Sequence, residues 1–133
     1  MNRKSQPRSF AALALILIHL IVSTLHGWAH QAAMVTLSTL GYLYVLVVIT
    51  VAPLVAGVLL LMRRRKAGAL LLALSMLGSF LFGFWFHFLS ATNDNVTQVH
   101  GPWHFTFLWT AVALAVIELA GALIGVWLYR SDA

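Results

Sequence analysis

Four long apolar segments account for nearly all of the chain and decide what it can fold into. They cover about residues 9–30, 35–62, 67–90 and 105–129. At about 1.5 Å per helical residue, each is long enough to cross a hydrocarbon core of about 30 Å. The chain has 133 residues, of which 62% are hydrophobic and only 8% charged, so little remains for a water-soluble domain. The sequence predicts an all-α integral membrane protein in which residues 1–133 form a single transmembrane domain.

The links between these segments predict how the helices are arranged. Residues 31–35 join the first segment to the second, and four basic residues join the second to the third. Links this short place consecutive helices side by side and antiparallel, as in an up-down-up-down bundle. The third link, residues 91–104, is long and polar. Long loops in compact proteins often have a function, so this loop is a candidate part of a site.

The basic residues predict how the bundle is oriented in the membrane. In a four-span arrangement all eight fall on one side: Arg3, Lys4, Arg8, Arg63, Arg64, Arg65, Lys66 and Arg130. The positive-inside rule assigns that side to the cytoplasm. We therefore expect both termini to be cytoplasmic and the loop 91–104 to lie outside. The net charge of +5 then indicates contact with anionic lipid headgroups of the bilayer, and no nucleic-acid binding is expected.

A secretory signal peptide is an alternative interpretation of the first segment. Such peptides also begin with basic residues followed by an apolar stretch. The apolar stretch from Phe10 to about Trp28 is longer than a usual signal core, and no clear small-x-small cleavage motif follows it. We therefore interpret this segment as a membrane span.

The histidines gather at one end of the predicted bundle. Two similar pentapeptides, HGWAH at 26–30 and HGPWH at 100–104, contain four of the six histidines. His87 lies near the end of the third segment, so every histidine except His19 falls at the outer face. His26 and His87 lie about 4 to 6 Å below the ends of their segments and therefore at one depth. The histidines and the basic residues thus occupy opposite faces.

This convergence predicts a metal site at the outer face. His26 and His30 are four residues apart, which places both imidazoles on one helix face at a spacing that suits a single metal ion. Pro102 fits the first turn of a helix, so His104 should begin the fourth span while His100 stays in the loop. A single interfacial histidine is weak evidence for a ligand, and the prediction rests on several reaching one leaflet. The predicted metal ligands are, in order, His26, His30, His87 and His104, followed by His100 and Asp94.

The ligand types leave the metal and its chemistry open. Imidazole suits copper, iron and zinc alike. Copper or iron would allow oxidation chemistry, whereas zinc with a bound water would allow hydrolysis. Haem b held by His26 and His87, with Gly83 making room for the porphyrin, is the second choice. It ranks second because haem propionates are usually balanced by arginine or lysine, and the outer half of the sequence has neither.

Two ionisable residues lie deeper, near the middle of the bilayer. His19 and Glu118 fall at similar depths on the first and fourth segments. A carboxyl group there is costly in either protonation state and usually faces the bundle interior with a partner. We expect His19 to be that partner. The pair is a candidate catalytic acid and base, or proton path, for the outer site; a structural clasp between two spans is equally compatible with the sequence.

A protein without catalysis of its own is the competing interpretation. Small four-span proteins can be accessory or assembly subunits of larger membrane complexes, and outer histidines would then bind metal in transit or contact a partner. Gly121 and Gly125 form a GxxxG step, which permits close helix approach within the bundle or in a homodimer, with the former favoured. No phosphate-binding loop or nucleophile elbow is present in the sequence.

Overall fold

The computed structural model describes residues 6–131, and all regular structure among them is helical. The elements are α1 (Gln6–Ala32), α2 (Thr39–Tyr44), the π-helix η2 (Val45–Val51), α3 (Ala52–Leu61), α4 (Arg65–Phe84), the π-helix η3 (Trp85–Leu89) and α5 (His104–Ser131). Four stretches are long and apolar enough to cross a membrane: Ser9–Ala32, Thr39–Leu61, Arg65–Leu89 and His104–Ser131. The predicted all-α fold with four membrane-spanning segments is confirmed.

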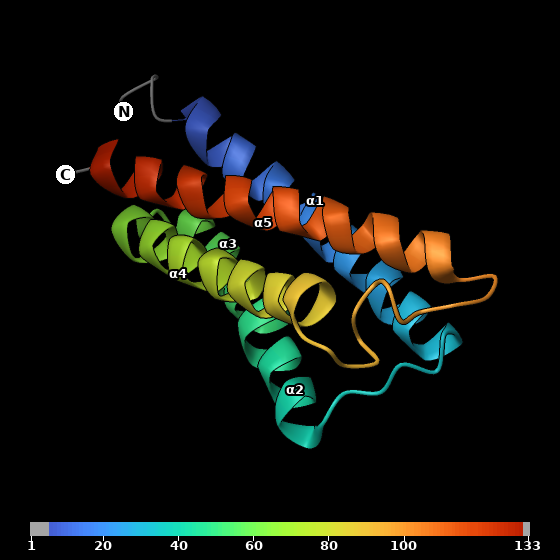
Figure 1. Ribbon diagram of the computed structural model, residues 1–133. Coiled ribbons are helices and arrows are strands. Elements are labelled where there is room, and N and C mark those ends of the chain that lie inside the picture. Colours follow the sequence, from blue (N-terminus) through green and yellow to red (C-terminus); the bar gives the residue numbers. More distant parts are fainter. Residues whose placement is uncertain (1–5, 132–133) are drawn as a thin grey trace.

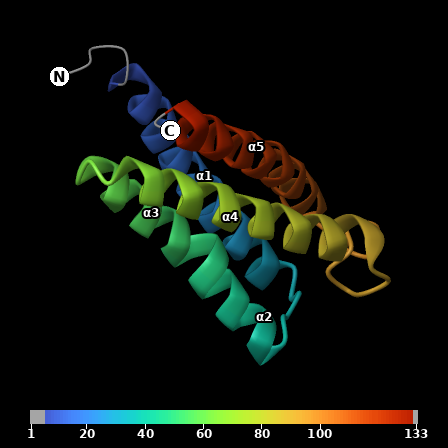
Figure 2. The ribbon, with the colours of Figure 1, turned by 90° about the vertical axis from the view of Figure 1, so that its left-hand side faces the viewer.

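Consecutive spans run in opposite directions, so the described ends of the chain lie at the same end of the molecule (Figure 1). α5 packs against both α1 and α4, and α3 packs against α4 (Figures 1 and 2). The link between α3 and α4 lies at the end where the chain starts and finishes, whereas the loop before α5 lies at the opposite end (Figure 1). The described basic residues of the α3–α4 link are therefore far from that loop.

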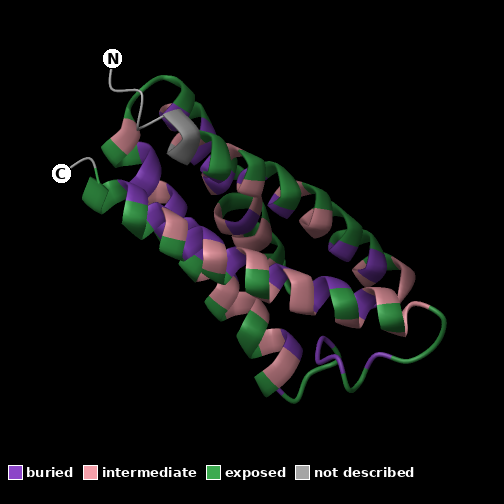
Figure 3. Ribbon diagram, turned by 90° about the horizontal axis from the view of Figure 1, so that it is seen from above, coloured by how far each residue is buried: buried purple, intermediate pink, exposed green. Residues whose placement is uncertain are grey.

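Small residues allow α4 and α5 to pack closely. Gly125 lies against the α4 backbone, since a Cβ atom added to it would meet the Ala73 nitrogen at 2.6 Å. A Cβ added to Gly121 would meet Met76 Cγ at 2.8 Å. The GxxxG step thus faces α4 of the same chain. Buried residues line the inner sides of the helices and exposed ones lie outside (Figure 3), where many are large and apolar, including Leu17, Leu46, Leu74 and Val116.

The second span differs in detail from the expected range of 35–62. Its helix begins at Thr39, because the Ser38 hydroxyl accepts a hydrogen bond from the Gly41 nitrogen at 3.1 Å and caps the helix there. Met34, with a φ of 58°, turns the chain away from α1. Pro53 occupies the first turn of α3, directly after the wide turns of η2. A proline is tolerated at such a position, because its missing N–H is needed least in a first turn.

Candidate metal centre

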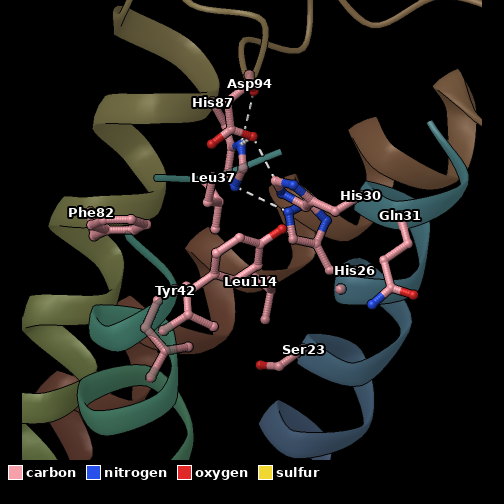
Figure 4. Close-up of a pocket in the computed structure, with 13 residues that line it drawn as sticks. Ser23, His26, His30, Gln31, Leu37, Tyr42, Phe82, His87, Asp94 and Leu114 are labelled. Atoms are coloured by element: carbon pink, nitrogen blue, oxygen red, sulfur yellow. Dashed lines mark hydrogen bonds and ion pairs between the residues drawn. The ribbon is translucent and has the colours of Figure 1, made fainter. Parts of the chain in front are cut away.

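Three histidines from two helices meet at the end of the molecule farthest from the α3–α4 link. His26 and His30 lie one turn apart on α1, and His87 comes from η3 (Figure 4). One nitrogen from each imidazole lies within 4.8 Å of the other two. His26 and His87 are almost fully buried, with 6% and 7% of their surface exposed. These three side chains, which we call the histidine triad, could together hold a metal ion.

His26 and His87 approach each other most closely. Their Nε2 atoms lie 3.0 Å apart, and the two rings are nearly perpendicular at 83°. This contact places the two residues at one level, as the depth estimate from the sequence predicts. Which proton, if any, lies between the two nitrogens depends on what the other nitrogen of each ring contacts.

Thr110 on α5 determines which ring nitrogen of His26 carries the proton. The His26 Nδ1 atom lies 2.7 Å from the Thr110 hydroxyl oxygen. That hydroxyl has a single hydrogen, which it donates to the Thr106 carbonyl at 2.6 Å or the Phe107 carbonyl at 3.1 Å. The hydroxyl therefore accepts from His26, so Nδ1 carries the proton. The Nε2 atom of neutral His26 is left with a free lone pair.

Asp94 lies against the other two histidines. His87 Nδ1 lies 3.1 Å from the Asp94 backbone carbonyl and 3.2 Å from its Oδ1 atom, both of which can only accept when the carboxyl is ionised. His30 Nε2 lies 3.3 Å from the same Oδ1 atom (Figure 4). His87 therefore donates its Nδ1–H to the Asp94 backbone carbonyl, which leaves the free lone pair of His87 on Nε2. His30 lies at ion-pair distance from the Asp94 carboxylate, whose two oxygens have no hydrogen-bond partner among the described residues.

The triad thus presents the unprotonated Nε2 atoms of His26 and His87, beside the ring of His30. The lone pairs of His26 and His87 face each other at 3.0 Å, and the buried Nδ1 atom of His30 has no hydrogen-bond partner among the described residues. Two facing lone pairs repel unless a cation lies between them or nearby. Metal-bound histidines typically donate their second N–H to a carboxylate or carbonyl, as His87 does to the Asp94 carbonyl.

The loop before α5 is held rigidly enough to place Asp94. The Asn95 side chain donates to the Ser90 carbonyl at 2.8 Å and accepts from the Thr97 nitrogen and hydroxyl. The Val96 nitrogen donates to the His87 carbonyl at 2.9 Å, which ties the loop to η3. Val96 and Val99 are buried in a cluster with Phe107. Asp94 is therefore delivered to the triad by a folded loop.

Phe107 forms the apolar backing of the triad. This fully buried ring lies 5.0 Å from His26, 4.8 Å from His30 and 5.4 Å from His87, measured between ring centroids. Neither Phe107 nor Thr110 is among the residues predicted from the sequence. A signal for Thr110 exists in its depth, since it lies six residues, or about 9 Å, below the start of its segment. No comparable signal marks Phe107 among so many apolar residues.

The structure does not bring His104 and His100 to the triad. The His104 Nδ1 atom donates to the Val99 carbonyl at 2.7 Å, because the chain folds back on itself just before α5. His100 is exposed on the loop. The expectation that both would join the ligand set therefore finds no support in the geometry. Of the two predicted contributions from the loop, it is Asp94 that reaches the histidines.

The deeper pair forms the expected contact between α1 and α5. His19 Nε2 lies 3.3 Å from Glu118 Oε1, and both residues are nearly fully buried. The Ser23 hydroxyl is 3.4 Å from the same His19 nitrogen. Gly83 lies between Glu118 and His87, because a Cβ added to it would be 3.8 Å from Glu118 Oε2 and 3.7 Å from His87 Cδ2. A catalytic role for the pair stays a prediction.

A cavity of about 160 Å³ adjoins the triad (Figure 4). The three histidines and Asp94 lie on one side of it, and the rest of its lining is mainly apolar, comprising Leu37, Val45, Ile49, Phe82 and Leu114. Tyr42 reaches into it from α2 with its hydroxyl toward the histidines (Figure 4). Tyr42 is not among the residues predicted from the sequence. A metal ion on the triad would therefore have open space beside it.

Comparisons with known proteins give no independent indication of what the site does. No protein-family model matches the chain, and neither does any curated protein or any solved structure. The chemistry of the site therefore has to follow from its own side chains and their geometry.

Proposed function

We propose that this multi-pass membrane protein binds one transition-metal ion, either copper, iron or zinc, through the imidazoles of His26, His30 and His87. The observation that supports this most strongly is the convergence of the three imidazoles, one nitrogen from each lying within 4.8 Å of the other two. The second ring nitrogen of His26 contacts the Thr110 hydroxyl and that of His87 the Asp94 carbonyl. Following the positive-inside rule, the site would lie at the outer face of the membrane, opposite the basic link between α3 and α4.

The geometry favours a compact ligand arrangement with an open position. In a tetrahedral site with metal–nitrogen bonds of about 2.0 to 2.1 Å, two ligand nitrogens are about 3.3 Å apart. The distance of 3.0 Å between His26 Nε2 and His87 Nε2 is close to this value. Three protein ligands and one free position are typical of catalytic metal sites. The free position would face the cavity and take a water molecule or a substrate, for hydrolysis with zinc or oxidation chemistry with copper or iron.

The haem alternative is less well supported. Two axial histidines lie on opposite sides of the porphyrin iron, which puts their nitrogens about 4 Å apart if each bond is about 2.0 Å. The observed 3.0 Å between His26 and His87 is too short for this. The side chain of His30 also lies against both rings, at centroid distances of 4.8 and 5.6 Å.

Metal analysis of the purified protein tests the proposal. The protein, extracted without chelators and loaded in turn with copper, iron or zinc, should retain about one equivalent of its preferred ion after desalting. The ion retained would also decide between hydrolytic and oxidative chemistry. Less than about a tenth of an equivalent of any ion would instead favour an accessory subunit without a metal centre. A strong absorption band near the blue edge of the visible would indicate haem.

Asp94 should affect metal affinity through the orientation of His30 and His87. Replacing it by alanine removes the carboxylate that lies against both rings, while the backbone carbonyl of residue 94 still accepts from His87. Loss of such a carboxylate beside metal-binding histidines typically weakens binding by about 10- to 100-fold. Asp94→Asn should be milder, because an amide oxygen can still accept from both rings. Metal titration would measure these affinities, with Asn93→Ala as control, since Asn93 is an exposed neighbour in the same loop. Unchanged affinity in Asp94→Ala would contradict this role.

A further inference from the structure

The cavity beside the triad has the size of a single six-membered ring. Its volume is about 160 Å³. An engineered apolar cavity of about 150 Å³ in another protein stays dry and binds benzene, so a cavity of this volume and lining can hold one ring. Leu37, Val45, Ile49, Phe82 and Leu114 provide apolar walls that would contact the faces and edges of such a ring. Without an occupant, these walls would lose that contact.

The cavity lies at the level of the membrane-spanning segments. Its lining residues from α1, η2 and η3 all belong to stretches that are apolar enough to cross a bilayer. α2 diverges from α1 toward this end of the molecule (Figures 1 and 2), and three of the lining residues are exposed, namely Gly27, Gln31 and Tyr42. A ligand could thus enter sideways from the lipid. Molecules that partition into lipid would have the easiest approach.

Within residues 6–131 the lining contains no arginine or lysine, and its one carboxylate, Asp94, lies within 3.3 Å of two histidine nitrogens. An anionic ligand would therefore lack a counter-charge, and a neutral one is favoured. One side of the cavity is nevertheless polar, because the triad and the Tyr42 hydroxyl lie there (Figure 4). A ligand with an oxygen at one end would place it on that side. The ring would occupy the apolar side.

We propose that this cavity binds a neutral, hydroxylated six-membered ring, such as a phenol, with its oxygen toward the metal and the Tyr42 hydroxyl. The inference extends the proposed function, since it names the class of molecule that would meet the metal's open position. The ring could be a free molecule or the head of a longer lipid-soluble chain whose tail leaves between α1 and α2. Both sources share the same ring chemistry.

Binding of 4-fluorophenol, followed by fluorine NMR on the metal-loaded protein in lipid nanodiscs, tests this inference. The wild-type protein should bind the probe above the background of empty nanodiscs, and fluorobenzene should bind at least about fivefold more weakly, as expected for one lost hydrogen bond. Tyr42→Phe should weaken the binding of 4-fluorophenol by a similar factor. If 4-nonylphenol displaces the probe, the cavity accepts the head of a longer chain whose tail extends out of it. If phenol displaces the probe and 4-nonylphenol does not, the cavity accepts only a free ring.

Filling the cavity provides the decisive variant. Ile49→Trp should reduce probe binding at least tenfold, because the larger side chain takes the place of the ring. Leu46→Trp is the matched control, since Leu46 is also on η2 but is 55% exposed and does not line the cavity. Equal binding by Ile49→Trp and wild type, at equal metal content, would overturn the inference and leave the metal proposal standing. Absence of metal in the wild type would defeat the metal proposal, while probe binding lost only in Ile49→Trp would still support the cavity.

Discussion

Replacing His87 by alanine should reduce bound metal from about one equivalent to below about a tenth, and His26→Ala should do the same. Each substitution removes one of three ligands and leaves the other two in a buried site with too few donors. Each substitution would also remove the contact of 3.0 Å between the Nε2 atoms of His26 and His87. Elemental analysis of purified variants, each checked for folding by circular dichroism, would measure the effect. His30→Ala should have the same effect, because the buried Nδ1 atom of His30 has no hydrogen-bond partner among the described residues.

The remaining histidines provide matched controls for this experiment. His104→Ala should keep the metal, since that ring donates to the Val99 carbonyl in its own loop. His100→Ala should also keep it, because His100 is exposed. His19→Ala removes a buried histidine that contacts Glu118 instead of the triad. Should all six substitutions lower the metal content equally, the metal would be held nonspecifically and the triad would not be a site.

The fold could be predicted because the membrane imposes a simple pattern on the sequence. Four apolar segments of sufficient length leave few alternatives for a chain this short, and the structure has four such helices. The depth of each residue in the membrane could be predicted for the same reason, since it follows from the position of that residue along its helix. This is why the sequence predicts that His26 and His87 share one depth and that His19 meets Glu118, as the structure has them.

What could not be predicted is the direction in which each side chain points. His104 has the right depth, but a hydrogen bond to Val99 turns its ring toward the loop. Tyr42 enters the cavity only because α2 diverges from α1 (Figure 2). No local sequence pattern predicts that divergence. Asp94 ranked last among the predicted ligands, yet its carboxylate contacts two histidines because Asn95 and Val96 fix the loop. Rotation about helix axes and loop conformation are tertiary properties that spacing alone does not encode.

Gly125→Ala should destabilise the protein by about 1 to 3 kcal/mol, which is the usual cost of overpacking a tight interface. The added methyl would lie 2.6 Å from the Ala73 nitrogen and 2.9 Å from the Ala69 carbonyl oxygen. Both are backbone atoms of α4, so they cannot move aside without separating the two helices. Unfolding in detergent, followed by tryptophan fluorescence, would measure the loss.

Alanine substitutions at two other glycines should have smaller effects on stability. Gly121→Ala should cost less than Gly125→Ala, because its methyl would meet the side chains of Met76 and Leu15, which can adjust. Gly27→Ala should be neutral or stabilise by up to about 1 kcal/mol, since alanine favours helices and nothing lies within 4 Å of the added atom. This order follows only if the GxxxG step joins α4 and α5 within one chain. If Gly125→Ala left monomer stability unchanged but abolished a dimer, the glycines would have to face a second copy, and the packing of α4 on α5 described above would be incorrect.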